Sequence, residues 1–223
     1  MLFVRFYAKL IKKIMDFISV YHRGSDMLVQ HDEEIKEDFD EIISVLKYIT
    51  DKDIIYEFNL RKLKRDNIKS LSEPINHLID QRLEKLGWTV QSPIFREIIH
   101  NKKDKTAWRL DFAKGTISVE VGYNHGEAIT HNIMKPVLAS ELNHVEKAIQ
   151  TRMGVIITAT DNLKKLGGFD SAVGSFEKYK SYLRPFNAII TVPLVLIGLE
   201  APTSFFVKHT KINKKTFGAI EMI

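Results

Sequence analysis

The sequence contains no cysteine among its 223 residues. This absence excludes disulfide bonds, thiolate catalysis and zinc sites built on cysteine, so any metal must bind to oxygen or imidazole ligands. Long hydrophobic runs are missing too, because the richest one, residues 188–199, contains Thr191 and Pro193 and is shorter than the roughly 20 residues that cross a bilayer. We therefore expect no membrane-spanning segment, and the composition is compatible with a reducing cytoplasm.

Several features that would indicate other functions are also absent. The chain shows no internal repeat, no low-complexity tract and no glycine-rich phosphate-binding loop. Its first 22 residues carry Lys9, Lys12 and Lys13 within an apolar pattern and lack the cleavage site of a secretory signal. The 44% of hydrophobic residues suffice for one main domain with its own core, and the formal charge of +5 favours a polyanionic partner.

Apolar residues at helical spacing predict two amphipathic helices in the first half of the chain. The first covers residues 32–49 and opens with acidic side chains. The second is expected to have Ser72 as its N-cap, Pro74 in its first turn and Gly87 in the left-handed position after its end. Residues 51–69 between them are highly charged without a sustained period, and we expect a solvated connector that is at most partly helical.

Alternating apolar and polar residues predict strands over 107–112 and 116–123, joined by a hairpin turn at 113–116. Continuous apolar runs at 153–158 and 192–199 are typical of strands buried on both faces. The other expected elements are an extended stretch from residue 88, a helix that starts near Pro136 and ends by residue 150, and a helix over 171–183. This order predicts an α/β fold with a mixed central β-sheet flanked by helices.

Two acidic residues of the predicted hairpin, Asp111 and Glu120, are candidates for a shared metal site. If Phe112 pairs with Ile117, Asp111 lies opposite Ser118 and diagonal to Glu120 on the same face, with the two Cβ atoms roughly 7 Å apart. Carboxylate oxygens suit Mg²⁺, which would polarise a phosphate and lower the pKa of an attacking water.

The spacing of these two acids is equally compatible with side chains that bind no metal. Asp111 would then pair with Arg109 or Lys114, and Glu120 would be a charge that faces the sheet edge. An Asp and a Glu nine positions apart on a hairpin are common by chance, so further residues must support a metal site.

One stretch, residues 110–124 (LDFAKGTISVEVGYN), resembles the active-site hairpin of type II restriction endonucleases of the BglII/BstYI type in the PD-(D/E)xK superfamily, in which an Asp, eight residues and a Glu hold the metal. Other stretches are similar to that family in the same order: residues 16–30, 75–88, 153–160 and 192–199. The resemblance predicts an endonuclease domain over residues 15–200, after an extension at 1–14 with Met15 as a candidate start, and before a basic C-terminal tail at 201–223 that either contacts the DNA backbone or stays mobile.

The resemblance implies a restriction-endonuclease-like core and a Mg²⁺-dependent enzyme that hydrolyses phosphodiester bonds in both strands of a short palindromic double-stranded DNA site. Asp111 and Glu120 would be its metal ligands and catalytic carboxylates. A two-fold symmetric site fits a homodimer. Such an enzyme is expected in the cytoplasm of a bacterium or archaeon.

The family's third catalytic side chain is missing from this sequence. It stands two residues after the Glu, is usually Lys in the superfamily and Gln in the BglII type, and orients the attacking water, whereas this chain has Gly122 there. Either the role has moved to another residue, or the protein binds a specific DNA sequence without cleaving it. The candidates for the moved role are Glu141, Glu127, His125 and Lys135. A further metal-site position of the family corresponds to Gln91, for which a surface amide at a strand start is an equal alternative.

By the same resemblance, two loops at residues 123–125 and 167–171 would face base edges in the major groove, where amide and hydroxyl groups can form specific hydrogen bonds. The predicted DNA-binding residues in these loops are Asn124, His125, Asp170 and Ser171. Phosphate contacts are predicted for Lys114, Lys135, Lys164 and Lys165. A third class of function, a structural or regulatory α/β protein with ordinary surface acids, predicts no salt-dependent DNA affinity.

Overall fold

One sheet of six strands forms the centre of the fold, which we describe from a computed structural model for residues 14–65, 67–96, 108–141, 145–213 and 215–223. Its strand order is β1-β6-β5-β4-β3-β2, and β7 and β8 form a separate two-stranded sheet. The elements in chain order are β1 (Phe17–His22), α1 (Ser25–His31), α2 (Glu33–Tyr48), α3 (Asp51–Lys64), α4 (Ser72–Lys85), β2 (Thr89–Pro93), β3 (Arg109–Lys114), β4 (Ile117–Val121), the 3-10 turn η3 (Gly126–Ala128), α5 (Ile129–Ser140), β5 (Met153–Ala159), α6 (Asp161–Leu166), α7 (Phe176–Leu183), β6 (Leu194–Leu199), β7 (Phe205–Ile212) and β8 (Lys215–Met222).

The sheet is mixed, as the sequence pattern predicts. Strand β5 runs parallel to both of its neighbours, β4 and β6. Strands β1, β3 and β2 join antiparallel to β6, β4 and β3, respectively. Every residue of β5 and β6 is buried, which explains why these strands are continuous apolar runs without alternation.

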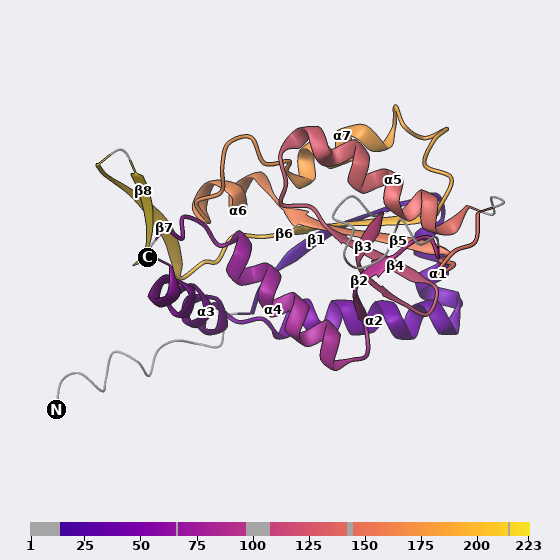
Figure 1. Cartoon of the computed structure of the whole chain (residues 1–223), viewed down its shortest axis with the longest axis horizontal. Helices are drawn as coiled ribbons and strands as arrows, with labels where there is room; N and C mark the ends of the chain where they lie inside the picture. The colour runs from indigo at the N-terminus through magenta and orange to yellow at the C-terminus, as the bar shows by residue number, and fades with distance from the viewer. Residues whose placement is uncertain (1–13, 66, 97–107, 142–144, 214) are drawn as a thin grey trace.

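Helices cover both faces of the sheet (Figure 1). Helices α2 and α4 lie below it in this view, and α5 and α7 lie above it. Val119 and Val155 pack in the core that contains residues of α2 and α4, whereas Ile156 packs with residues of α5 and α7. Glu120 is the register partner of Ile156 on the neighbouring parallel strand, so its side chain faces α5.

The two helices predicted in the first half of the chain are present, with one difference in capping. Helix α2 begins where the Asp32 carboxylate accepts a hydrogen bond from the Ile35 amide. Gly87 has φ of 84° after α4, as predicted. Ser72, however, is the first residue of α4 and not its N-cap, because the chain already has helical backbone angles at Leu71.

Residues 51–64 form a complete helix, α3, where we expected a solvated connector. A capping box starts it: the Thr50 hydroxyl accepts from the Asp53 amide, and the Asp53 carboxylate accepts from the Thr50 amide. Ile54 and Phe58 are fully buried on its inner side. Other apolar residues of α3, among them Tyr56 and Leu63, are exposed, so its apolar residues do not keep to one face and the helical period is obscured.

Two later helices have limits that differ from the predictions. Helix α5 begins at Ile129, before the predicted start near Pro136, so the proline lies in its interior; the helix ends at Ser140, also earlier than predicted. The proline gives up a helical hydrogen bond, but it lies directly over Gly154 of β5, where a Cβ would be only 2.6 Å from the proline ring. Helix α7 begins at Phe176, later than predicted, because the Ser175 side chain caps it.

The C-terminal residues 205–222 form the β7–β8 hairpin, which stands beside α3 at one end of the molecule (Figure 1). Phe205 and Val207 belong to the main core. The Gly218 amide also donates to the Ile68 carbonyl at 3.0 Å. This part of the predicted basic tail is therefore folded against the body, while the limits of the endonuclease domain stay a prediction.

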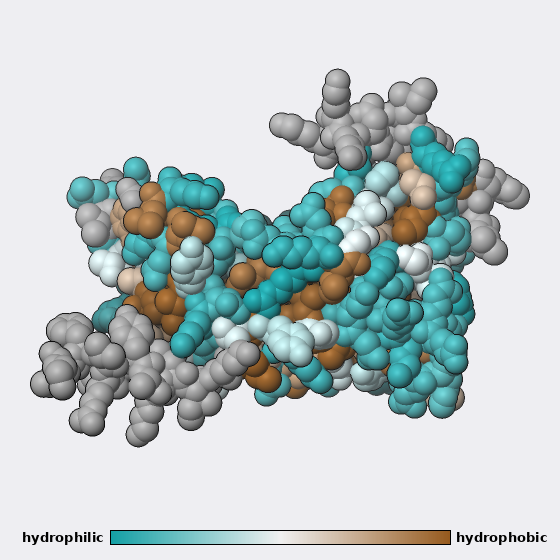
Figure 2. Space-filling view, turned by 90° about the horizontal axis from the view of Figure 1, so that it is seen from below, coloured by the Kyte–Doolittle hydropathy of each residue, from teal (hydrophilic) through white to brown (hydrophobic). Residues whose placement is uncertain are grey.

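The surface is hollowed between this hairpin and the rest of the molecule. Seen from below, a broad concave edge separates the lobe with β7 and β8, on the left, from the body that holds the sheet (Figure 2). In the described part of the chain, no helix combines the length and the apolar character needed to span a membrane.

Candidate active site

The predicted hairpin of β3 and β4 is present, with a shorter turn than expected. Lys114 pairs with Ile117 across a two-residue turn in which Gly115 has φ of 50°, a conformation that glycine adopts without strain. Phe112 consequently pairs with Val119 and not with Ile117. A shift of two residues keeps every side chain on its face of the sheet. The two predicted acids therefore still share a face, and this register places them opposite each other and not diagonally.

Asp111 is half-buried, and hydrogen bonds hold both of its carboxylate oxygens. Oδ2 accepts from the Val121 amide at 2.7 Å, and Oδ1 accepts from the Gln91 side-chain amide at 3.2 Å. The Asp111 amide in turn donates to Oε1 of Glu120 at 3.3 Å. Beyond Phe112 and Val119, the last residues paired through their backbones, hydrogen bonds to the two acidic side chains hold β3 and β4 together.

Glu120 is a buried carboxylate, only 1% exposed. Its Oε2 accepts a hydrogen bond from Nζ of Lys135 on α5 at 2.7 Å. Burial, together with the charge of Asp111, raises the pKa of Glu120 well above its usual range, against the opposing effect of Lys135. A bound cation would relieve this repulsion between the two carboxylates.

Gln91, which we predicted as a metal-site residue or a surface amide, lies beside Asp111 on β2. The residues on either side of it stay paired with β3, whereas Gln91 itself has φ of 51°. A residue other than glycine in this region carries a strain of about 1–3 kcal/mol, which is found most often at functional sites. The exposed side chain of Gln91 reaches Asp111 from the solvent side.

Among the contacts of the described residues, Lys135 is the one candidate for the missing third side chain that reaches the acid pair. Glu141 follows the last residue of α5, and its carboxylate bonds with the Thr191 hydroxyl, so the structure does not bring it to the pair. His125 and Glu127 are exposed at η3. Lys135, which we also predicted as a DNA contact, forms an ion pair with Glu120.

Tyr179 of α7 fills the space beside Gly122, where the third side chain would start. A Cβ on Gly122 would lie 2.3 Å from the Tyr179 Oη and 2.8 Å from its Cζ. Tyr179 is 2% exposed, and its hydroxyl accepts from Nδ2 of Asn132 at 2.7 Å. Burial raises the pKa of Tyr179 to about 12, so the group is a neutral phenol at physiological pH.

The two loops predicted to contact bases lie side by side. The Gly126 amide donates to the Ala172 carbonyl at 2.7 Å, and the Gly174 amide donates to the Asn124 carbonyl at 3.0 Å. The predicted DNA-binding residues of both loops are exposed: Asn124, His125, Asp170 and Ser171. These loops, which are distant in sequence, therefore form one continuous surface.

The lysines predicted for DNA phosphates have mixed surroundings. Lys114 binds the Glu41 carboxylate of α2, and Lys164 donates to the Val173 carbonyl, which follows the second loop. Lys165 is exposed on α6. Since Lys114 turns toward α2, it does not form the ion pair with Asp111 that we considered as an alternative to a metal site.

One acid near the pair was missed by the sequence analysis. Asp80 of α4 is half-buried, and burial followed by the charge of Asp111 raises its pKa. Its sequence signal is only a carboxylate next to the apolar stripe of a helix, which is common. Within the described ranges, no three carboxylate or imidazole groups lie close enough to hold a metal ion, so Asp80 does not complete a three-residue metal site with the pair.

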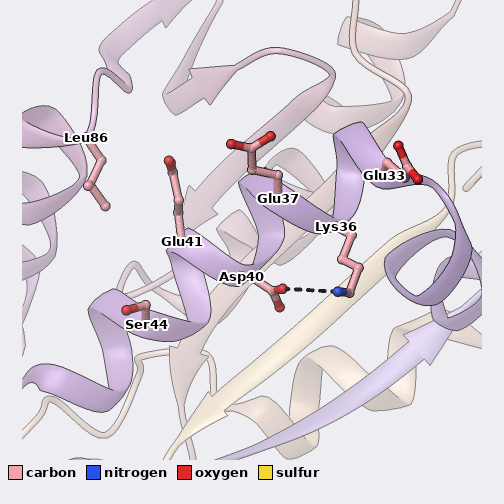
Figure 3. A pocket seen from close by; sticks show the side chains of 7 residues that line it. All are labelled: Glu33, Lys36, Glu37, Asp40, Glu41, Ser44 and Leu86. Carbon is pink, nitrogen blue, oxygen red and sulfur yellow. Dashed lines mark ion pairs between the residues drawn. The ribbon is translucent and has the colours of Figure 1, made fainter.

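A hollow on the outer side of α2 has a different character. Its acidic lining consists of Glu33, Glu37, Asp40 and Glu41, with Lys36 paired to Asp40 at 3.9 Å (Figure 3). Such a face repels polyanions.

The donor set at the pair fits a hard divalent cation. Each carboxylate oxygen has two lone pairs, and each of the four oxygens has one hydrogen bond described above. Mg²⁺ is commonly held by one or two carboxylates, with waters and substrate phosphate oxygens in its remaining positions. Asp111 and Glu120 supply that number of ligands.

Comparisons with known proteins identify the family of this chain. Two crystal structures are similar: restriction endonuclease BglII complexed with a DNA 16-mer, with a TM-score of 0.60, 15% identity and coverage of 94% of this chain and 100% of that chain, and free BglII, with a TM-score of 0.45, 16% identity and coverage of 94% and 93%. A search of curated proteins finds no match. The family model described as restriction endonuclease BglII/BglIII matches residues 17–199. Because this match spans most of the chain, the protein belongs to the BglII/BglIII restriction endonuclease family.

Proposed function

We propose that the protein cleaves both strands of a short palindromic DNA site with Mg²⁺ held by Asp111 and Glu120. Membership of the family makes it a site-specific hydrolase of DNA phosphodiester bonds. The metal, its ligands and the assembly are our proposal. The observation that carries it is the buried carboxylate of Glu120 beside that of Asp111 on one face of a hairpin.

The residues around the pair would orient the metal ligands before substrate arrives. The Val121 amide and Gln91 hold Asp111, while Lys135 and the Asp111 amide hold Glu120. Mg²⁺, when bound, would polarise the scissile phosphate and make a water more acidic. Because the carboxylates are already fixed by hydrogen bonds, little reorganisation would accompany the reaction.

The DNA contacts and the assembly follow from the same proposal. The adjoining loops with Asn124, His125, Asp170 and Ser171 would contact bases of double-stranded DNA, since their side chains are exposed. A homodimer would present two copies of the site to the two strands of a palindrome. Such an enzyme would act in the cytoplasm of a bacterium or archaeon.

A digest of DNA of known sequence with Mg²⁺, followed by sequencing of the fragment ends, tests the proposal. Discrete ends that share one sequence motif support it, whereas a gel shift without cleavage would identify a non-cleaving DNA-binding relative. Asp111→Asn and Glu120→Gln should each slow cleavage at least about 100-fold while the fold is kept. The matched controls Asp40→Asn and Glu37→Gln, on the acidic side of α2, should cut at the wild-type rate. Full activity of either site variant would contradict the assignment.

A further inference from the structure

We propose that Lys135 is the third catalytic side chain of this enzyme, supplied by α5 because the position of Gly122 cannot hold one. The inference rests on the proposed function. We first predicted that Lys135 contacts a DNA phosphate, and we now propose that it acts on the water and the phosphate that react.

The structure explains why Gly122 cannot take this role itself. The glycine is fixed on two sides: its amide donates to the Ile157 carbonyl at 2.8 Å, and its carbonyl accepts from the Thr158 hydroxyl at 2.8 Å. On the third side the buried ring of Tyr179 occupies the space of a Cβ. Neither the strand end nor the tyrosine can move without losing hydrogen bonds or core packing. A side chain for the reaction must therefore come from another element.

Lys135 comes from the element that covers this face of the sheet. Pro136, the next residue, lies against Gly154 of β5 and keeps α5 close to the strands. From there the Lys135 ammonium reaches Glu120 at 2.7 Å, with its side chain 15% exposed. An ammonium group has three N–H donors. One is used on Glu120, and the others can donate to a water or a phosphate oxygen beside the carboxylates.

The chemistry of hydrolysis defines what such a group can do. The oxygen of a water forms a bond to phosphorus, and the bond from phosphorus to the leaving deoxyribose oxygen breaks. The water gives a proton to solvent, and the leaving oxygen takes one up from solvent. Lys135 already donates a hydrogen bond to Glu120, so we assign it the part of a hydrogen-bond donor. It would orient the water and stabilise the charge that develops on the phosphate oxygens.

A merely structural role for Lys135 predicts different kinetics. If the lysine only kept Glu120 in place for the metal, its loss would weaken Mg²⁺ binding, and enough Mg²⁺ would restore the rate. If it acts on the water or the phosphate, the rate stays low at saturating Mg²⁺. Single-turnover cleavage measured across a series of Mg²⁺ concentrations separates the two.

The first experiment compares Lys135→Met with the matched control Lys47→Met, which changes an exposed lysine of α2. Lys135→Met should slow single-turnover cleavage at saturating Mg²⁺ by about 100- to 1,000-fold. Its DNA affinity without metal should stay within about threefold of wild type. The control should cut normally. A rate restored by Mg²⁺, or a loss of less than about threefold, would overturn the inference.

A second experiment does not depend on how well Lys135→Met folds. Because the chain has no cysteine, Lys135→Cys introduces its only thiol. Alkylation with 2-bromoethylamine rebuilds an ammonium side chain of nearly the same length, and methyl methanethiosulfonate gives an uncharged adduct. With modification verified by mass spectrometry, the ammonium adduct alone should recover at least about tenfold in rate. Equal rates for the two adducts would refute a role of the ammonium group.

Failure of this inference can be told apart from failure of the proposed function. If the wild-type protein binds DNA but never cuts it with Mg²⁺, both the proposed function and the inference about Lys135 are refuted. A wild-type protein that cuts, combined with a Lys135→Met variant that also cuts, removes only the inference about Lys135.

Discussion

The close packing of Gly122 against Tyr179 leads to a quantitative prediction for Gly122→Ala. The new Cβ would lie 2.3 Å from the tyrosine Oη, whereas ordinary contacts begin at 3.4 Å, so the hydroxyl must retreat by about 1 Å. That movement breaks its 2.7 Å hydrogen bond from Asn132, which is 2% exposed. Overpacking destabilises by about 1–3 kcal/mol, and an unpaired buried amide by about 1–3 kcal/mol. Because one movement causes both effects, we expect a combined loss of about 2–4 kcal/mol.

A double-mutant cycle with Tyr179→Phe tests this reasoning by urea unfolding. Tyr179→Phe removes the closest atom but leaves Cζ at 2.8 Å from the new Cβ, so it relieves only part of the clash. The loss in the double variant should therefore be smaller than the sum of the single losses by about 1 kcal/mol or more. Tyr182→Phe, on the same helix, is the matched control. A Gly122→Ala loss below about 0.5 kcal/mol, or additivity within that margin, would show that Tyr179 does not fill this space.

Other parts of the fold give three further predictions. Burial raises the pKa of Asp53, but hydrogen bonds from Thr50 and Arg82 outweigh it and leave that pKa below its usual value. Urea unfolding should therefore show that Asp53→Asn destabilises by about 0.5–1 kcal/mol at pH 7, and the difference should become smaller as pH falls below roughly pH 4 toward the lowered pKa. Phe205→Ala should cost about 3–5 kcal/mol, since the ring is fully buried, and an unchanged melting temperature would argue against a packed hairpin. The logarithm of DNA affinity should fall linearly with that of salt concentration, and Lys165→Ala should reduce the slope by about one if this lysine contacts a phosphate.

Much of the fold follows from short-range patterns in the sequence. The continuous apolar runs of β5 and β6 and the alternation in β3 and β4 predict the mixed sheet, because strand periodicity directly reflects which faces are buried. Gly87 marks the end of α4 for a similarly local reason, its positive φ. Elements that rest on a few specific contacts were harder to predict. Helix α3 begins at a capping box and buries only part of one side, and α5 tolerates Pro136 because Gly154 faces it.

The acid pair was predictable from the sequence, while its surroundings were not. Asp111 and Glu120 lie on one hairpin, so their proximity follows from a single turn. The contact of Lys135 with Glu120 depends on how α5 crosses the sheet, and that of Tyr179 with Gly122 depends on α7. No local spacing rule connects residues on separate elements. The resemblance to the family could identify the missing side chain but could not choose among its replacements.

For this site, it matters more whether an error in the pairing of β3 with β4 is an even or an odd number of residues than how large the error is. We expected Phe112 opposite Ile117, and the structure pairs it with Val119, an error of two residues. Because side chains alternate with a period of two, an error of two leaves both acids on the face toward α5, whereas an error of one would place them on opposite faces of the sheet. The alternation of apolar and polar residue types in β4 (ISVEV) and through most of β3 (RLDFAK) determines parity even when the turn length is misjudged. An inference about paired strand residues is therefore robust where alternation is clear, as it is for Asp111 and Glu120.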